Sequence, residues 1–326
     1  MPIRYRNRFQ SLRSAVKLLS LPLLLLGLTA SPAEAQTRER GPLVLELPAN
    51  TKALALGNAF ALGFQDPDAV FYHPGLLNRA QGMAVSVQRF GEASTLAAFS
   101  AGTSWYKGGV VLGAQLLTYG ADAGNSVEAE DILALSDDPG SIRDEGSVGV
   151  SEMALSLGYG QTVKGIRMGV VGKLVEQRFG NLNVATAAAD FGMAFSPGPL
   201  TVGLAVQNLG SALDFGDVEI PLPVRFNLGA TSRRRPVGPL DLAASTAVSY
   251  RMDGDVIPSA GVEVAYWPVS GRTFLGRVGY RYLPDHWSGS PVTFGGAFFG
   301  DNIVLEYAYE GFDSGDPSHR VSVGWR

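Results

Sequence analysis

The side chains of this 326-residue chain that could carry chemistry are its acids and bases, because it has no cysteine and only three histidines. His73, His286 and His319 lie far apart, and no H-x-x-H or H-E-x-x-H spacing is present. A zinc or di-metal centre therefore lacks its usual ligands, and we expect each histidine to be structural or solvated. The G-x-S-x-G motif of serine hydrolases is also missing. We accordingly expect no metal, no cofactor and no enzymatic activity.

Two acids that flank a proline, Asp66 and Asp68, stand out as a candidate gating pair. They lie in ALGFQDPDAVFYHPGLLN, residues 61–78, a largely apolar stretch that proline interrupts twice. A carboxylate in a confined, partly dry space must be paired or hydrogen-bonded. We therefore expect these two acids to face arginines inside the fold, such as Arg277 or Arg281.

The residues before these acids favour a short helix with an apolar face. NTKALALGNAFALG, residues 50–63, carries small side chains along its length. The helix is expected to end at Asp66-Pro67, since the residue before a proline disfavours helical geometry. His73-Pro74-Gly75 is then expected to turn the chain toward a first strand at Gly82. The apolar face of the helix must be buried by another part of the chain.

The first 35 residues are typical of a signal peptide. A basic region precedes the apolar run LLSLPLLLLGLTA, and Ala33-Glu34-Ala35 matches an A-x-A cleavage site. An uncleaved membrane anchor is the alternative, but this run of about 13 residues is shorter than the roughly 20 that a spanning helix needs. We expect export and cleavage near Ala35. The formal net charge of −4, which becomes more negative without the basic leader, makes nucleic acid an unsuitable partner.

Beyond residue 82 the hydrophobic pattern repeats every two residues. In SEMALSLGY, Leu155 and Leu157 alternate with Glu152 and Ser156, and IRMGVVGKLVEQ and IVLEYAY alternate in the same way. Period two indicates amphipathic strands. The predicted strands are residues 82–90, 93–104, 107–119, 147–162, 165–177, 184–196, 199–209, 222–233, 238–251, 256–268, 272–283, 290–300, 301–311 and 317–326. Most match the roughly 9–11 residues of a membrane-spanning strand, whereas soluble strands average about five or six.

A soluble β-sandwich also alternates, so the connections between strands decide the architecture. Every second connection is short, namely SWYKG, TVKG, SPGP, RRRPVG, PVSG and GDN, whereas the others include long loops such as the one over residues 119–147. Outer-membrane barrels show this alternation of short periplasmic turns and longer outer loops. We therefore predict an all-β transmembrane outer-membrane barrel of about 14 antiparallel strands over residues 81–326, with an N-terminal helical hatch over residues 36–80.

The hatch is expected because fourteen strands enclose more space than side chains alone fill. Its candidate gating residues are Asn58, Phe60, Phe64, Asp66, Pro67, Asp68, Phe71, Tyr72, His73 and Pro74. The predicted inward faces of the strands carry charges of both signs. They are Glu152, Arg167, Lys173, Glu176, Asp190, Arg225, Glu263, Arg277, Arg281, Glu306 and Arg320. One interpretation is a network that lines the lumen and holds the hatch, and the other is a substrate path gated by the two acids of the hatch.

Residues 53–78, ALALGNAFALGFQDPDAVFYHPGLLN, resemble the N-terminal signature of the PorV/PorQ family, relatives of the FadL-type outer-membrane transporters. The Ala/Gly-rich helix and the doubly acidic turn are present, whereas His73-Pro74-Gly75 stands where the family has Asn-Pro-Ala. Later segments, including VGLAVQNLGSAL, IPLPVRFNLGAT and LEYAYEGF, are similar to the family as well. The resemblance implies a fourteen-stranded barrel with an N-terminal hatch. It also implies either passage of hydrophobic small molecules or an accessory role in type IX protein secretion.

Two functions follow as hypotheses. A transporter needs an apolar pocket, which the hatch aromatics would have to supply because the inward strand faces are mainly Gly, Ala, Ser and charge. A secretion barrel would instead bind secreted cargo through its outer loops, and the acidic loop over residues 119–147 is the candidate.

The expected surroundings are outer-membrane lipid and lipopolysaccharide. The closing strand, with Val321, Val323 and Trp325 on one face, resembles the signal that outer-membrane assembly machinery reads, although the chain ends in Arg326.

Overall fold

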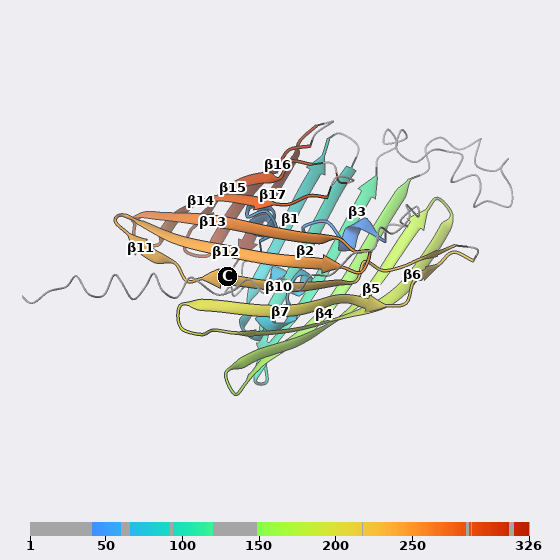
Figure 1. Ribbon diagram of the computed structural model, residues 1–326, viewed down its shortest axis with the longest axis horizontal. Coiled ribbons are helices and arrows are strands. Elements are labelled where there is room, and N and C mark those ends of the chain that lie inside the picture. Colours follow the sequence, from blue (N-terminus) through green and yellow to red (C-terminus); the bar gives the residue numbers. More distant parts are fainter. Residues whose placement is uncertain are drawn as a thin grey trace, which may run out of the picture. The chain divides into compact units, whose positions relative to one another are not determined.

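Fourteen antiparallel strands close into a barrel in the part of the chain that the structure, a computed structural model, describes (Figure 1). The described residues are 41–59, 66–91, 94–119, 149–216, 218–284, 287, 289–312 and 316–325. The predicted signal peptide, Phe60, Phe64 and residues 120–147 of the acidic loop lie outside them. Within the described stretches no helix is both long and apolar enough to cross a membrane.

The barrel strands follow one another as antiparallel neighbours, and β1 pairs with β17. Their bounds are β1 Gly82–Phe90, β2 Ser94–Trp105, β3 Gly108–Tyr119, β4 Val150–Val163, β5 Ile166–Phe179, β6 Leu182–Phe195, β7 Leu200–Gly210, β10 Arg225–Ser232, β12 Leu240–Arg251, β13 Val256–Val269, β14 Arg272–Arg281, β15 Val292–Phe299, β16 Ile303–Glu310 and β17 Ser318–Trp325. The connection between β7 and β10 carries a small hairpin, β8 Leu213–Asp214 and β9 Glu219–Ile220. The predicted fold class and strand number are confirmed.

One predicted turn is shorter in the structure than in the sequence interpretation. The stretch RRRPVG, residues 233–238, contains a further strand piece, β11 Arg235–Val237, which pairs with the start of β12. The hairpin therefore turns at Gly238, whose φ of 64° is left-handed. Pro236 has no N–H to donate, and such a residue is tolerated in a short piece at the end of a strand.

The two faces of each strand differ as the alternation predicts. On β4, Leu157 is 60% exposed and faces outward, whereas Ser156 is buried and faces the lumen. Outward positions elsewhere are also large and apolar. Glu176 was predicted to face inward, which is wrong, because it shares the outward face of β5 with Leu174 and forms an ion pair with Arg178.

This assignment of faces predicts an asymmetric response at residue 157. Leu157→Arg should lower the free energy of unfolding by about 2–4 kcal/mol, because the charge is placed near the middle of the lipid-facing surface. Reversible unfolding in lipid vesicles measures this cost. Leu157→Phe, which keeps the site apolar, is the control and should change stability little; an equal loss in both variants would contradict the lipid-facing assignment.

Candidate functional site in the barrel lumen

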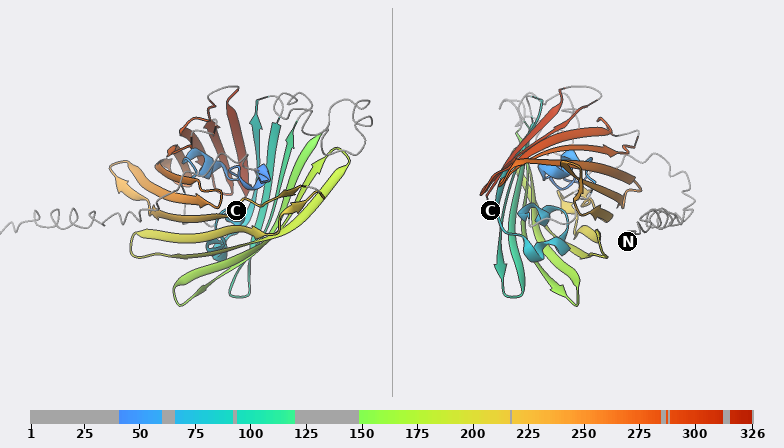
Figure 2. Two further views of the ribbon diagram at one scale, coloured as in Figure 1. Left: turned by 45° about the vertical axis from the view of Figure 1, so that its right-hand side comes forward. Right: turned by 90° about the vertical axis from the view of Figure 1, so that its left-hand side faces the viewer.

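The lumen is occupied by the chain that precedes β1. Its described parts, residues 41–59 and 66–81, are called the inner segment here. They form η1 Leu43–Leu45, α2 Thr51–Ala55, η2 Pro67–Phe71 and η3 Pro74–Arg79. These short helices lie within the ring of strands (Figure 2). Most of their apolar side chains are buried.

The helix of the inner segment is shorter than predicted. α2 ends at Ala55, not at Asp66-Pro67. Gly57 and Asn58 both have left-handed φ values, and Asn58 N–H donates to the Ala53 carbonyl at 2.7 Å while Gly57 N–H donates to the Leu54 carbonyl at 3.1 Å. These two hydrogen bonds form a Schellman motif, which terminates a helix with glycine at C′.

The two prolines begin helical turns, whereas the sequence interpretation made them stops. Pro67 is the first residue of η2 and Pro74 is the first residue of η3. Proline suits this position because its fixed φ is helical and its missing N–H would have no partner there. Asp66 caps η2 by accepting from Asp68 N–H at 2.9 Å. The predicted start of the first strand at Gly82 is confirmed.

Inward glycines of the strands form the surface on which the inner segment lies. A Cβ at Gly113 on β3 would lie 2.7 Å from the Phe71 ring, and one at Gly160 on β4 would lie 2.9 Å from the Asn78 nitrogen. At Gly109 an added Cβ would collide with the Leu77 carbonyl oxygen. The strand backbone and the inner segment are therefore in direct contact, with no side chain between them.

Arg320, on β17, is the most heavily used contact between barrel and inner segment. Its guanidinium donates to the carbonyl oxygens of Pro48, at 2.8 Å, and Ala49. It also donates to Ser86 at 2.6 Å and to Gln88 at 3.1 Å, both on β1. This fully buried side chain thus joins the seam between the first and last strands to the segment inside.

Other inward side chains bond the backbone of the inner segment from different directions. Glu152 accepts from Val44 N–H at 2.7 Å, and Gln115 donates to the Val44 carbonyl at 2.9 Å. Gln207 donates to the Phe71 carbonyl at 3.0 Å. These bonds satisfy backbone groups that short irregular helices leave without intrahelical partners.

Asp66 and Asp68 do not pair with Arg277 or Arg281, so that prediction is wrong. Asp68 accepts from Asn50 Nδ2 at 2.8 Å and from Ser100 Oγ at 2.5 Å. Neutral donors satisfy the buried carboxylate here. Arg277 and Arg281 are each held by glutamates of the strands, as described next.

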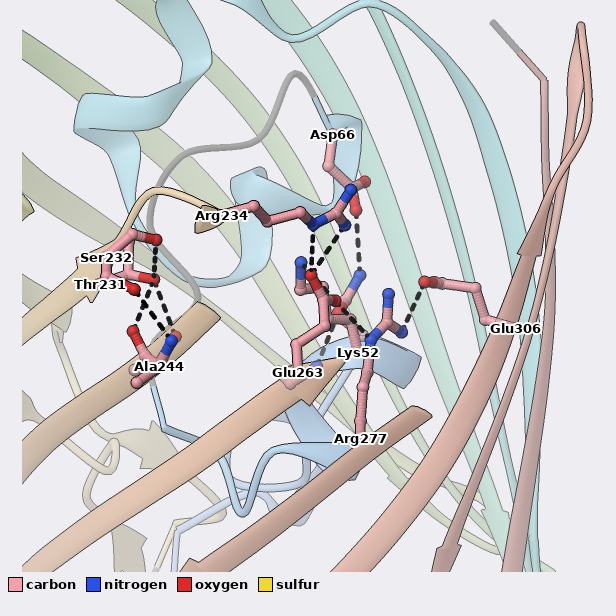
Figure 3. Close-up of polar contacts among 12 residues, drawn as sticks. Lys52, Asp66, Thr231, Ser232, Arg234, Ala244, Glu263, Arg277 and Glu306 are labelled. Carbon is pink, nitrogen blue, oxygen red and sulfur yellow. Dashed lines mark hydrogen bonds and ion pairs between the residues drawn. The ribbon is translucent and has the colours of Figure 1, made fainter. Parts of the chain in front are cut away.

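A five-residue group called the Glu263 cluster holds α2 against β13 and β14 (Figure 3). Glu263 lies 3.1 Å from Lys52 Nζ, 2.7 Å from Arg234 and 2.8 Å from Arg277. Arg277 also bonds Glu306 at 2.7 Å. The inner segment contributes Lys52, the one buried lysine or arginine in its described residues, to this group. Burial lowers the pKa of Lys52 to about 7 despite the charge of Glu263.

The remaining predicted lumen charges form separate groups. Lys173 and Asp190 pair at 2.8 Å, and Arg225 lies nearby, bonded to Gln207 at 3.0 Å. Arg281 pairs with Glu310. Arg167 bonds Ser196 at 2.9 Å and joins none of these groups. The charges thus form several local clusters and not one continuous network.

Among the hatch residues named from the sequence, Phe71, Pro74 and His73 are buried, and Tyr72 Oη accepts from Asn50 N–H at 3.1 Å. Burial lowers the pKa of His73 to about 4, so the ring is neutral at pH 7.

Several site residues were missed by the sequence analysis. Glu46 on the inner segment forms a two-bond pair with Arg251, at 2.6 and 3.0 Å. Lys52, Gln88, Gln115, Gln207 and Glu310 were missed as well. The three glutamines have inward parity on β1, β3 and β7, which is the sequence signal that identifies them.

An apolar cavity of about 230 Å³ lies at the end of the barrel with the longer connections. It is bordered by Leu43 and Leu47 of the inner segment and by Leu283, Trp287 and Phe312 of those connections. Its polar wall includes Glu46, Asn58, Tyr72, Gln207, Arg225, Arg251 and Arg281.

A basic cavity of about 530 Å³ lies at the opposite end, beside the short turns at Gly165 and Ser196. The two cavities border the same four strands, β7, β10, β12 and β13. On β12, for example, Ser245 borders the basic cavity and Ala247 the apolar one. The turn Leu56–Asn58 fills the interval, with Leu56 on the basic side and Asn58 on the apolar side.

Structure comparison places the fold among outer-membrane barrels of known architecture. The Pseudomonas putida toluene transporter TodX superposes with a TM-score of 0.53 at 12% identity, covering 84% of this chain and 95% of that one. The CymD monoaromatic hydrocarbon channel gives 0.52 at 11% identity, covering 85% and 97%. A Pseudomonas aeruginosa FadL homologue gives 0.51 at 11% identity, covering 86% and 98%. No protein-family model and no curated protein matches the sequence. At such identities the likeness shows the fold alone, a β-barrel like those of TodX and the FadL homologue.

The close contacts between strand glycines and the inner segment predict that an added methyl group weakens docking at some glycines and not at others. Gly109→Ala should destabilise docking of the inner segment by about 1–3 kcal/mol, because the new methyl group overlaps the Leu77 carbonyl. Faster proteolysis within residues 41–81 of the folded protein is the expected readout. Gly172→Ala is the matched control, since an added Cβ there meets no atom within 4 Å. Equal protease resistance of both variants would show that the close approach at Gly109 has no energetic consequence.

The two acids predict that docking of the inner segment weakens as pH rises from 5 to 7. Burial, with the neighbouring charge of Asp68, raises the pKa of Asp66 from 3.8 to about 7. A raised carboxyl pKa stabilises the docked state at low pH, and this contribution is lost as pH rises through about 7. Protease sensitivity of the inner segment should therefore increase over this range.

Asp66→Asn is the test variant for this pH dependence, because the amide keeps the shape and cannot ionise. Its pH slope should be smaller than that of the unsubstituted protein. An identical slope would assign the titration to another group, with Asp68, whose pKa burial also raises, as the first to examine.

Proposed function

We propose that this protein is an outer-membrane barrel that passes small hydrophobic or amphipathic molecules through its lumen. The apolar cavity carries the proposal. Its border of leucine, tryptophan and phenylalanine side chains suits an apolar ligand, and a dry cavity of about 150 Å³ is enough to hold benzene. At about 230 Å³ the cavity matches a single-ring hydrocarbon or a short-chain amphiphile.

The polar wall of this cavity favours ligands with one polar end. Arg251 is neutralised by Glu46, and its guanidinium stacks on Trp287 at 5.1 Å from the ring centre. Arg225 is bonded to the neutral amide of Gln207 and is thereby the cation best placed to receive a ligand carboxylate. The fold is that of a toluene transporter and of a monoaromatic hydrocarbon channel, which supports the apolar class of ligand.

Passage requires the turn Leu56–Asn58 to move, because it separates the two cavities. The turn is held by short contacts to glycine, including Gly261, where an added Cβ would lie 2.8 Å from the Leu56 carbonyl oxygen. Gly57 N–H also donates to Thr293 at 2.9 Å. We propose this turn as the gate, in place of the acid pair suggested from sequence.

The PorV/PorQ relationship, the cleaved leader and the location in the outer membrane remain part of this proposal. A role in protein secretion stays a prediction, since most of the acidic loop that suggested it lies outside the described residues.

Ligand binding at Trp287 tests the proposed function. Toluene added to the purified protein in nonionic detergent should change the tryptophan fluorescence saturably, because Trp287 borders the apolar cavity. Trp287→Ala should abolish the saturable change. Trp267→Ala removes an indole that is 46% exposed and does not border the cavity, and this control should retain the saturable change. A signal lost in both variants, or a linear one in the unsubstituted protein, would count against a ligand site in the apolar cavity.

A further inference from the structure

The basic cavity has a composition that docking of the inner segment does not explain. Five cations border it, namely Lys52, Arg79, Arg167, Arg233 and Arg234, against the single carboxylate Glu263. Glu263 is already matched by three cations of its own cluster. The cavity wall therefore has a clear excess of positive charge.

Three arginines produce this excess. Among the described residues, no carboxylate lies within ion-pair distance of Arg79, Arg167 or Arg233. The positive charges of Arg79 and Arg233 lie near the guanidinium of Arg167, and the Arg167 side chain is partly buried. Like charges held together in this way repel one another. A bound anion would relieve that repulsion.

The other groups of the cavity wall are suited to the same ligand. Hydroxyl groups from four strands border it, on Thr162, Thr201, Thr231 and Ser245, and Ser196 adds one from a turn. Hydroxyls donate hydrogen bonds, and a guanidinium offers a planar fork that matches a carboxylate or phosphate with two bonds. The volume of about 530 Å³ lies in the range of small-molecule sites, roughly 300–1,000 Å³.

We propose that the basic cavity binds the oxyanion group, carboxylate or phosphate, of a small molecule. Arg167, Arg79 and Arg233 provide the charge, and Ser196, which Arg167 bonds at 2.9 Å, fixes the orientation of the central guanidinium. The site lies on the far side of the turn Leu56–Asn58 from the apolar cavity. It does not require that hydrophobic molecules pass through the lumen.

Isothermal titration of the full-length protein in nonionic detergent with inorganic phosphate tests the proposal. Phosphate should bind, and Arg167→Gln and Arg233→Gln should each weaken binding about tenfold, the expected cost of one charge-assisted bond. Arg272→Gln is the control: it removes an exposed arginine at the same end of the barrel that does not border the cavity. No binding to the unsubstituted protein, or an equal loss in Arg272→Gln, would overturn the proposal.

Hexanoate distinguishes the two sources of such an anion. Binding that is weakened by Arg167→Gln but not by Trp287→Ala supports a free anion reaching the cavity from the short-turn end. Binding weakened by both substitutions supports an amphiphile whose tail lies toward the apolar cavity. Hexanoate and phosphate binding that are both insensitive to Arg167→Gln would contradict the site. Toluene binding is read separately at Trp287, so failure of this site and failure of the proposed function remain distinguishable.

Discussion

The interior of this barrel depends on supplying hydrogen bonds to backbone that cannot supply its own. The inner segment has one α-helix of five residues and three short 3-10 turns, so much of its backbone lacks intrahelical partners. Buried and unpaired, each such group costs free energy. The inward side chains of the strands act as those partners, and Arg320, by donating to two successive carbonyls, is the strongest example.

This requirement constrains the strands as tightly as it constrains the inner segment. On β3, Gly109 and Gly113 admit the inner segment while Gln115 bonds it. All three share the inward parity, so a slip of one residue would remove the contact surface and the hydrogen bond together. The inward residues of the strand thus determine both the strand register and the docking of the inner segment.

The sequence indicates the barrel well because membrane strands obey a simple rule. Alternation and connection length located all fourteen strands within a few residues, and β1 over 82–90 was obtained without error. The inner segment follows no comparable rule. Its helix ends at the glycine of a Schellman motif, and the sequence interpretation gave weight to Pro67 and overlooked Gly57-Asn58.

Partner choice among the lumen charges was harder to predict for a different reason. Inward parity places Arg277 in the lumen, and the predicted hatch places Asp68 there, but neither says which height or side each residue occupies. In the structure Arg277 forms an ion pair with Glu263, whereas Asp68 accepts hydrogen bonds from Ser100 and Asn50. Nothing in the local pattern distinguishes a carboxylate that meets arginine from one that meets amide and hydroxyl donors, because those neighbours come from distant parts of the chain.

The position of Arg320 has a consequence for how the molecule is assembled. The residue lies on the last strand, separated by 272 positions from the carbonyl that it binds at Pro48. Contacts across so long a chain form late. The bonds from Arg320 to Pro48 and Ala49 therefore cannot form until β17 is in place beside β1. Closure of the barrel between β1 and β17 and formation of this anchor thus depend on the same strand, and a chain truncated before β17 loses both.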